Sequence, residues 1–417
     1  MGKKLKICIV SREYPPHTLW GGIGTFTYNL AHGLKNVGHD VDVLAFTLWD
    51  EEHAEDNGIH VHRISSPKVP FKQKTYWDYA TSALSPFAFF YSFKIRKKIE
   101  ALHREKQYDV IDFPEHIGEG FFTALTGKYP TLVRLFTPLS LIGHMGLNRS
   151  TNALDYFLFG LMEKSSIKQA TAINAPSRNL AELVRKAFRI RRPIEVIYNP
   201  IDSDKFSPEP SVHTSGDGLI KVLFVGRLED RKGAHILARA IPQVVLKAKK
   251  AKFIILGSDC RGVNGFHSMK EFMLQIFREQ EVAEHVEFRD PIPYDTLPAL
   301  YNSADISVAP SLYDNSPYTC LEAMSCGLPV VSTSAGGMPE YIDHRKNGII
   351  VPPNDVSALA EAITDLVLNA EKRREYGILA RGKAVSEFKR EVVATKLTEL
   401  YHKTIKKYRN SAGKNLK

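Results

Sequence analysis

The sequence has few cysteines and no long apolar run. Its 417 residues include four cysteines, and none lies in a C-x-x-C pair beside a second such pair. This pattern supports neither a disulfide framework nor a zinc site, and a reducing compartment fits it best. No apolar segment reaches the roughly 20 residues that span a bilayer, and Ile7–Val10 is too short for the core of a signal peptide. We therefore expect a cytoplasmic protein.

Composition excludes several other classes. Glycine and proline total 50 residues and hydrophobic residues make up 43% of the chain, so collagen-like, low-complexity and wholly disordered structures are excluded. The net charge of +10 predicts attraction to polyanions such as nucleic acid, anionic lipid or phosphorylated substrates. Charge alone does not choose among these, but no recognition module for nucleic acid is visible, so we expect no nucleic-acid partner.

Buried strands alternate with helices along the chain. Residues 6–10 are almost continuously apolar, as in a parallel strand covered on both faces. A glycine-rich loop, a helical pattern over 25–35 and a second buried strand at 41–46 follow. Further strands are expected at 109–113, 131–136, 171–175, 195–198, 220–225, 253–256, 286–288, 306–310 and 329–332.

The alternation is interrupted once. Residues 202–218 are rich in Asp, Ser, Pro and Gly and show little periodicity. Strand and helix patterns resume after them, which predicts two doubly wound α/β domains of similar size. We place these domains at 1–200 and 201–385, followed by a terminal segment at 386–417.

A basic loop follows the strand at 220–225. The strand runs into Gly226 and Arg227, and Lys232 precedes a helix. Ligands of open α/β sheets bind beyond the carboxyl ends of the strands, and helix N-termini, Arg and Lys all attract phosphate. The loop therefore predicts a diphosphate site; a solvated basic turn is the alternative.

An acidic loop follows the strand at 306–310. Asp314 falls in the loop and Glu322 on the helix after it. Two carboxylates at a sheet edge can accept hydrogen bonds from vicinal hydroxyls of a sugar or ribose, and the first helical turn can bind a phosphate. The alternative is a turn followed by a solvated helix.

Glycines mark two further loops, at Gly21-Gly22-Ile23-Gly24 and Gly336-Gly337. Neither is a G-x-G-x-x-G fingerprint, so dinucleotide binding is poorly supported, but such glycines allow a phosphate to approach the backbone closely. Taken together, the four loops resemble those of the retaining GT-B glycosyltransferases of family 4, over nearly the whole chain. The motifs that carry the resemblance are Gly21-Gly22, Asn199-Pro200-Ile201-Asp202, Gly226-Arg227 with Lys232-Gly233, Leu321-Glu322-Ala323-Met324 with Gly327-Leu328-Pro329, and Gly336-Gly337-Met338-Pro339-Glu340.

The resemblance implies two Rossmann-like domains facing each other across a cleft, with a terminal helix near 388–408 crossing back to the first. It implies catalytic roles for three residues: Arg227 and Lys232 neutralise the donor diphosphate, and Asp314 contacts the transferred sugar. Glu322 binds the ribose. The other donor-binding positions that it implies are Gly21, Gly22, Gly226, Ile292, Tyr318 and Thr319.

The chain departs from the family pattern at three positions. Asp314 replaces a glutamate, Pro317 replaces a glycine and has no N–H to donate, and Phe136 stands where many members carry a histidine. His116 or His144 could take the place of that histidine, and an ordinary surface or internally bonded histidine is the alternative. Acceptor binding is expected from Glu115, His116, Arg134 and His144.

The expected function is retaining transfer of a sugar from a nucleoside-diphosphate sugar to an acceptor hydroxyl, in polysaccharide or glycoconjugate synthesis. We expect a UDP-sugar rather than a GDP-sugar, no cofactor and no bound metal; Asp202-x-Asp204 matches a metal-binding motif only in letters and is interpreted as a turn. The acceptor is a glycan, a lipid-linked acceptor or a small molecule. A nucleotide-sugar epimerase and a catalytically weak nucleotide-sugar-binding protein remain alternatives.

One segment is open between two interpretations. Aromatic residues over 87–93 precede a basic cluster over 94–98. The aromatics either pack into the core, with a solvated helix behind them, or lie on the inner face of an anionic membrane.

Overall fold

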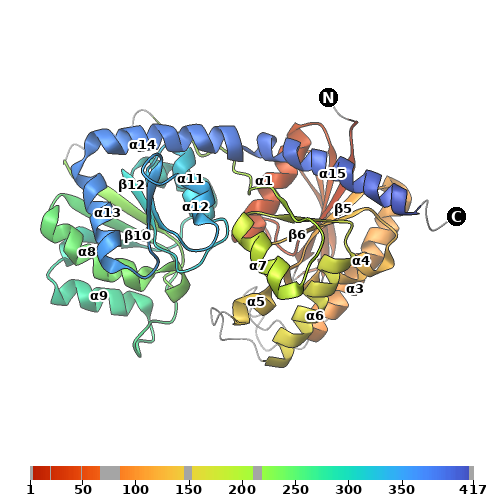
Figure 1. Ribbon diagram of the computed structural model, residues 1–417, viewed down its shortest axis with the longest axis horizontal. Helices are drawn as coiled ribbons and strands as arrows, with labels where there is room; N and C mark the ends of the chain where they lie inside the picture. Colours follow the sequence, from red (N-terminus) through yellow and green to blue (C-terminus); the bar gives the residue numbers. More distant parts are fainter. Residues whose placement is uncertain are drawn as a thin grey trace. The chain divides into compact units, whose positions relative to one another are not determined.

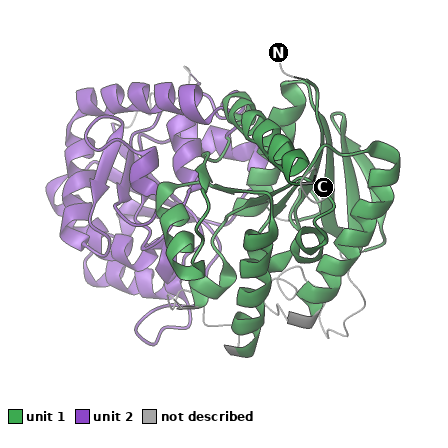
Figure 2. Cartoon of the chain, turned by 45° about the vertical axis from the view of Figure 1, so that its right-hand side comes forward, with its two compact units in different colours: residues 1–200, 390–417 green, residues 201–389 purple. Residues whose placement is uncertain are grey.

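The chain forms two compact α/β units (Figures 1 and 2). Unit 1 comprises residues 1–200 and 390–417, and unit 2 comprises residues 201–389. The computed structural model describes residues 3–18, 20–47, 49–65, 85–144, 153–209 and 218–412. No helix among them is long and apolar enough to cross a membrane.

The chain leaves unit 2 after Lys389, not after residue 385 as the sequence analysis placed it. The reason is a short π-helical turn, η5 (Ala384–Phe388), which still belongs to unit 2. Its buried Phe388 accepts a backbone hydrogen bond from Ile201 (2.8 Å), so the two chain crossings are tied together inside unit 2.

Unit 1 is built on an eight-stranded sheet with the order β3-β4-β2-β1-β5-β6-β7-β8. All neighbours are parallel except β3, which runs antiparallel to β4. The strands are β1 (Lys6–Val10), β2 (Asp40–Thr47), β3 (Glu52–Asp56), β4 (Ile59–Ser65), β5 (Val110–Pro114), β6 (Thr131–Arg134), β7 (Ala172–Ala175) and β8 (Glu195–Val196).

Helices cover the sheet of unit 1: α1 (Gly22–Asn36), α3 (Ser85–Lys106), the 3-10 helix η1 (His116–Gly118), α4 (Phe121–Thr126), α5 (Leu139–His144), α6 (Ala153–Gln169), α7 (Arg178–Phe188) and α15 (Arg390–Ala412). Helix α15 packs on α1 at Gly33, where an added Cβ would lie 2.5 Å from the carbonyl oxygen of Arg390. Asn36 also donates to Glu391 (2.7 Å). The end of the chain is therefore part of unit 1.

Two features of unit 1 differ from the sequence analysis. Helix α1 begins at Gly22 rather than at Thr25, so Gly22 to Gly24 form its first turn instead of a loop. The hairpin β3–β4 was not predicted, because β3 is exposed and carries no alternation of apolar and polar residues.

Unit 2 is built on a six-stranded, wholly parallel sheet with the order β11-β10-β9-β12-β13-β14. Its strands are β9 (Ile220–Val225), β10 (Ala251–Leu256), β11 (Val286–Arg289), β12 (Ile306–Ala309), β13 (Val330–Thr333) and β14 (Gly348–Val351). With helices packed on each sheet, the prediction of two doubly wound α/β domains is confirmed (Figure 1).

The helices of unit 2 are η2 (Asp230–Lys232), α8 (Ala234–Lys247), α9 (Met269–Glu279), η3 (Ala283–His285), η4 (Tyr294–Thr296), α10 (Leu297–Asn302), α11 (Tyr318–Ser325), α12 (Met338–Tyr341), α13 (Val356–Leu368) and α14 (Ala370–Lys383). The Asp202-x-Asp204 segment is a turn, in which Asp202 accepts the N–H groups of Asp204 (3.2 Å) and Lys205 (3.1 Å).

Candidate functional site

Three loops meet at the carboxyl edge of the sheet in unit 2. Strands β9 and β12 are neighbours, and the chain passes from β9 to β10 on the other side, so this is the point where the strand order reverses. Gly233 approaches the Pro310 carbonyl so closely that a Cβ would lie 2.0 Å from its oxygen, and Gly336 approaches the Asp314 carbonyl at 2.1 Å by the same measure. The glycines are required because backbones touch here.

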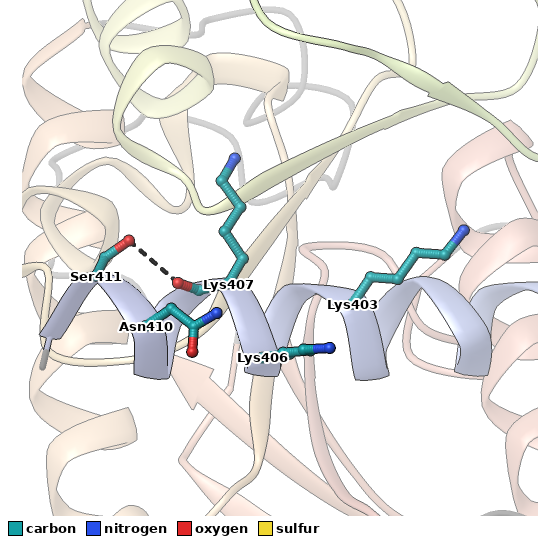
Figure 3. A pocket seen from close by; sticks show the side chains of 5 residues that line it. All are labelled: Lys403, Lys406, Lys407, Asn410 and Ser411. Carbon is teal, nitrogen blue, oxygen red and sulfur yellow. Dashed lines mark hydrogen bonds between the residues drawn. The ribbon is translucent and has the colours of Figure 1, made fainter.

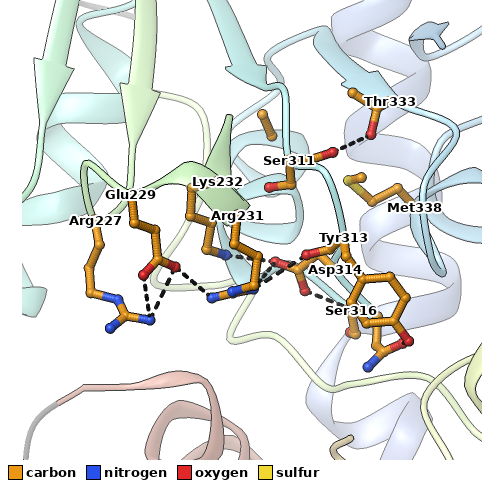
Figure 4. A network of polar contacts seen from close by, with 12 residues as sticks. Arg227, Glu229, Arg231, Lys232, Ser311, Tyr313, Asp314, Ser316, Thr333 and Met338 are labelled. Carbon is orange, nitrogen blue, oxygen red and sulfur yellow. Dashed lines mark hydrogen bonds and ion pairs between the residues drawn. The ribbon is translucent and has the colours of Figure 1, made fainter. Parts of the chain in front are cut away.

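Charged side chains of opposite sign form a continuous network along this edge (Figure 4). Lys232 Nζ lies 2.6 Å from Asp314 Oδ2, and Arg231 lies 4.0 Å from the same oxygen. Glu229 then joins Arg231 (2.9 Å) to Arg227 (3.0 Å). The structure thus brings together the three residues predicted as catalytic, which come from the loops after β9 and β12.

Two members of the network, Glu229 and Arg231, were missed by the sequence analysis. Both belong to the same basic loop as Arg227 and Lys232, so their charge was the available signal. Burial acts to raise the pKa of Asp314, but the charges of Lys232 and Arg231 outweigh it and hold the pKa below its ordinary value. Asp314 is therefore an ionised carboxylate in contact with two cations, Lys232 and Arg231.

Glu322 lies on α11 and is buried, 4% exposed. Its Oε2 accepts a hydrogen bond from Tyr301 Oη (2.8 Å) on α10. Burial raises the pKa of Glu322 to about 7, although the Tyr301 hydrogen bond and the charge of Lys205 act in the opposite direction. A carboxyl group that changes charge near neutral pH is suited to accept hydrogen bonds from hydroxyls when ionised.

The other donor positions predicted in unit 2 surround this edge. Gly226 directly follows β9 and has φ 152°, and Pro317 precedes the first turn of α11. Tyr318 at the start of that turn is buried and Thr319 is half-buried. Ile292 is half-buried in the loop between β11 and η4. Because Pro317 offers neither an N–H nor a side-chain acceptor, only residues after it can donate from this helix end.

The predicted glycines of unit 1 lie at the N-terminus of α1. The carboxylate of Glu13 occupies this helix end: its Oε2 accepts the N–H of Gly24 (3.2 Å), and a Cβ on Gly21 would lie 2.9 Å from the same oxygen. Helix N-termini bind anions, so an internal anion already sits where a phosphate was expected near Gly21 and Gly22.

Two buried carboxylates hold the loop after β6. Glu115 accepts the N–H groups of Phe136 (2.9 Å) and Thr137 (3.0 Å), and Glu163 accepts those of Leu139 (2.8 Å) and Ser140 (3.3 Å). Burial raises the pKa of Glu115 to about 8 and that of Glu163 to about 7. The Glu115 carboxylate is therefore engaged by the backbone of the loop after β6, which argues against the predicted role in acceptor binding. Glu163 was not among the predicted site residues.

The remaining acceptor candidates differ in their surroundings. Burial lowers the pKa of His116 to about 3, and the charge of Arg12 adds to the shift, so the ring is neutral. His116 is half-buried beside Thr137, whose φ of 116° is unusual for a residue with a side chain. The side chain of His144 lies outside the described residues.

The structure places Arg134, the last of the predicted acceptor residues, in an internal ion pair. Its guanidinium is 3% exposed, pairs with Asp112 and stacks on the ring of Phe26 at 4.2 Å. Tyr401 of α15 also donates to Asp112. This internal neutralisation argues against a role in acceptor binding, because a buried charge must be paired inside the fold.

Two basic pockets lie elsewhere on unit 1. One, of about 370 Å³, is lined by Lys403, Lys406, Lys407, Asn410 and Ser411 of α15, with Ser411 bonded to the Lys407 carbonyl at 3.1 Å (Figure 3). The other, of about 460 Å³, is lined by Lys168, Arg189, Ile190, Arg191 and Arg192. No predicted site residue lines either pocket. The Lys and Arg side chains that line them contribute to the positive charge of unit 1.

Comparison with known proteins gives the family. Residues 20–205 match the model of Glycosyltransferase Family 4, and residues 207–383 match that of Glycosyl transferases group 1. An uncharacterised glycosyltransferase of Methanocaldococcus jannaschii is 31% identical over 387 residues, which cover 89% of this chain and 91% of the relative.

Solved structures agree on the fold. Sucrose-phosphate synthase from Thermosynechococcus elongatus superimposes with a TM-score of 0.78 at 20% identity, covering 96% of this chain and 99% of the other. HepE of Anabaena, solved in complex with UDP, superimposes with a TM-score of 0.69 at 19% identity, covering 96% of this chain and all of the other. The chain thus belongs to the GT-B glycosyltransferases of family 4, the group 1 glycosyl transferases.

Proposed function

We propose that the chain transfers a glycosyl group from a nucleoside-diphosphate sugar to an acceptor hydroxyl with retention of the anomeric configuration. The observation that carries the proposal is the charged network of Figure 4, in which Arg227, Arg231 and Lys232 converge at the point where the strand order reverses. A diphosphate binds such a set of cations, and ligands of open α/β sheets bind at such an edge.

The proposed chemistry is electrostatic. The acceptor oxygen forms a bond to the anomeric carbon on the face from which the diphosphate departs. The electron pair of the broken carbon–oxygen bond goes to the diphosphate, which also takes the acceptor proton. Lys232 and Arg227 stabilise the developing negative charge, a contribution worth about 3–4 kcal/mol per well-placed donor. The proposal needs no metal ion because these side chains supply the positive charge.

The donor is proposed to bind unit 2 through three groups. The diphosphate lies against the loop after β9, the ribose against Glu322, and the transferred sugar against Asp314. UDP is the proposed carrier. HepE, which has the same fold, was solved in complex with UDP-glucose. The proposed role of the product is in polysaccharide or glycoconjugate synthesis.

The test begins with the donor. Thermal shifts measured with UDP-, GDP-, ADP- and dTDP-glucose identify the base, since a ligand at about 100 times its Kd adds about 2.7 kcal/mol of apparent stability. Transfer to glycan and lipid-linked acceptors is then followed by NMR, in which the anomeric coupling reports retention or inversion. An unchanged rate in the presence of EDTA agrees with the proposal.

Other outcomes identify the rival functions. Formation of an epimerised sugar from the donor alone identifies an epimerase. A thermal shift with no turnover on any acceptor identifies a nucleotide-sugar-binding protein that lacks transfer. Inversion of the anomeric centre, or no shift with any nucleotide sugar, contradicts the proposal.

A further inference from the structure

The net positive charge of the chain comes from unit 1. Unit 1 contains 34 Lys and Arg against 21 Asp and Glu, a net charge of +13, whereas unit 2 contains 22 against 25, a net charge of −3. The charged network proposed to bind the diphosphate lies in unit 2. The excess of basic residues in unit 1 therefore serves another purpose. A strongly basic unit attracts an anionic surface or polymer.

Exposed apolar side chains are also concentrated in unit 1. Among the described residues, twelve large hydrophobic side chains are exposed, and seven of them lie on three helices, α3, α4 and α6. These seven are Phe89 (45% exposed), Phe90 (57%), Phe93 (37%), Leu125 (47%), Leu154 (66%), Phe157 (63%) and Leu161 (51%). An apolar concentration of this kind on a surface marks an interaction site.

The three helices are neighbours. Phe122 of α4 contacts Phe89 (4.8 Å between ring centroids) and Phe93 (5.5 Å) of α3. Phe121 of α4 packs with Phe159 and Met162 of α6 in a small buried cluster. Figure 1 shows α3, α4 and α6 on the same part of unit 1. We call the seven exposed side chains on these helices the apolar face.

The spacing within each helix separates this face from the core. Phe89 and Phe93 project from α3 on the side away from buried Phe87 and Tyr91, and exposed Phe90 lies at the border between the two sides. On α6, Leu154, Phe157 and Leu161 follow at intervals of three and four residues, on the side away from buried Phe159. Segment 87–93 thus contributes Phe87 and Tyr91 to the core and leaves Phe89, Phe90 and Phe93 exposed.

Basic side chains flank the apolar face. Lys97 Nζ lies 4.9 Å from the centroid of the Phe93 ring, and the guanidinium carbon of Arg96 lies 6.0 Å from the same centroid. On α6 the two acidic residues, Asp155 and Glu163, are buried, while Lys164 and Lys168 are half-buried and exposed. Exposed aromatic and leucine side chains beside lysines bind the interface of an anionic bilayer, with the rings among the lipid headgroups.

We propose that unit 1 docks on an anionic lipid bilayer through the apolar face of α3, α4 and α6. The observation is independent of the proposed transfer reaction, because it concerns other residues and another unit. Lipid is favoured over a soluble polyanion because large apolar side chains lie among the lysines. A soluble polyanion offers no apolar region in which these side chains could be buried.

The experiment is vesicle flotation of the full chain, without donor or acceptor. Vesicles of phosphatidylcholine are compared with vesicles containing about one third phosphatidylglycerol. The expected result is flotation with the anionic vesicles, weakened at high salt because the screening length shortens. Phe90→Ser combined with Phe157→Ser weakens the partition about tenfold or more, since both rings leave the interface.

Matched variants in unit 2 control for surface changes in general. Leu246→Ser with Ile378→Ser removes side chains that are 80% and 64% exposed, and flotation should not change. Lys97→Glu with Lys168→Glu weakens binding, whereas Lys249→Glu with Lys250→Glu does so much less. Circular dichroism melts confirm that each variant is folded.

Three results overturn the proposal: no flotation with either vesicle, equal losses in the unit 1 and unit 2 variants, or a lipid-free dimer that Phe90→Ser with Phe157→Ser converts to a monomer. The last result identifies a second copy of the chain as the occupant. Because flotation needs no turnover, a protein that floats but transfers no sugar disproves the proposed function and leaves docking intact.

Discussion

Lys232 and Asp314 form an ion pair, with 2.6 Å between Nζ and Oδ2, that joins the loop after β9 to the loop after β12. Their side chains are 21% and 14% exposed, so the pair is mostly shielded from water. A donor diphosphate must therefore compete with Asp314 for this cation, or share it.

Replacement of Lys232 by alanine is expected to lower the transfer rate about 10²-fold, because about 3 kcal/mol of leaving-group stabilisation is lost. The measurement is kcat and kcat/KM for the donor. Lys372→Ala serves as control, since Lys372 forms an ion pair of the same kind with Asp365 (2.8 Å) in the same unit. Near-normal transfer by Lys232→Ala, or an equal loss in Lys372→Ala, would contradict the phosphate role.

Glu322 predicts a pH dependence of nucleotide affinity. The pKa of Glu322 is raised to about 7, so ionisation between pH 6 and 8 creates a carboxylate that can accept from ribose hydroxyls. We expect UDP affinity, measured by calorimetry, to rise up to about tenfold over this range, since a hydrogen bond to a charged group contributes about 1.5–3 kcal/mol.

Two variants separate this effect from the titration of the diphosphate itself. Glu322→Gln removes the contribution of the carboxyl group and retains that of the ligand. Tyr301→Phe removes a hydrogen bond that lowers the pKa of Glu322, so the inflection moves to higher pH. A pH profile identical in wild type and Glu322→Gln would show that Glu322 does not contact the ribose.

Glu115 predicts that unit 1 loses stability as the pH rises. Burial raises the pKa of Glu115 to about 8 in the folded state, whereas the unfolded chain releases this proton near its ordinary value. The stabilising contribution is complete below the unfolded pKa and is lost as pH rises through the folded pKa. Relative to Glu115→Gln, the wild type should lose about 3 kcal/mol of unfolding free energy between pH 5 and 8.

Tryptophan fluorescence measures this effect specifically. All three tryptophans, Trp20, Trp49 and Trp77, belong to unit 1. Urea unfolding followed by their emission therefore reports on unit 1 alone. Glu182→Gln is the control, because Glu182 is an exposed carboxylate of α7 paired with Arg185. If the wild type and Glu115→Gln change in parallel with pH, the assignment to Glu115 is wrong.

Gly336 predicts a coupling between backbone packing and the site. A Cβ at Gly336 would lie 2.1 Å from the Asp314 carbonyl oxygen, and the residue has φ 62°. We expect Gly336→Ala to destabilise the protein by about 1–3 kcal/mol and to weaken donor binding, because Asp314 must move. Gly382→Ala is the control: nothing lies within 4 Å of its added Cβ, and alanine favours the helix by about 1 kcal/mol. Thermal melts and UDP titration measure both effects.

The sequence was most informative where burial is two-sided. Strands β1 and β9 are continuous apolar runs, and both occur within a residue of their predicted bounds. Strand β3 was not predicted because it is an exposed strand that pairs with β4 at the end of the sheet. The start of α1 was misplaced because glycines normally signal a loop, while here the Glu13 carboxylate binds the first turn.

The site residues were also predictable where the sequence signal is local and unpredictable where it depends on distant contacts. Arg227, Lys232 and Asp314 stand in loops next to one another in the sheet, so the strand pattern and the motifs sufficed to bring them together. The internal ion pair of Arg134 was not predicted, because Asp112, and the Tyr401 hydroxyl that donates to Asp112, are far from it in the sequence. Glu163 lacked any local motif, and only the folded loop at residues 136–140 shows what its carboxylate does.

The return of the chain to unit 1 has a consequence for synthesis. Unit 2 is one uninterrupted stretch, whereas Asp112 and His39 of unit 1 find Tyr401 and Thr398 only on the last helix. A ribosome therefore releases every residue of unit 2 before the first half of the protein can be completed. The amino-terminal segment, although made first, cannot complete its contacts until α15 has been made.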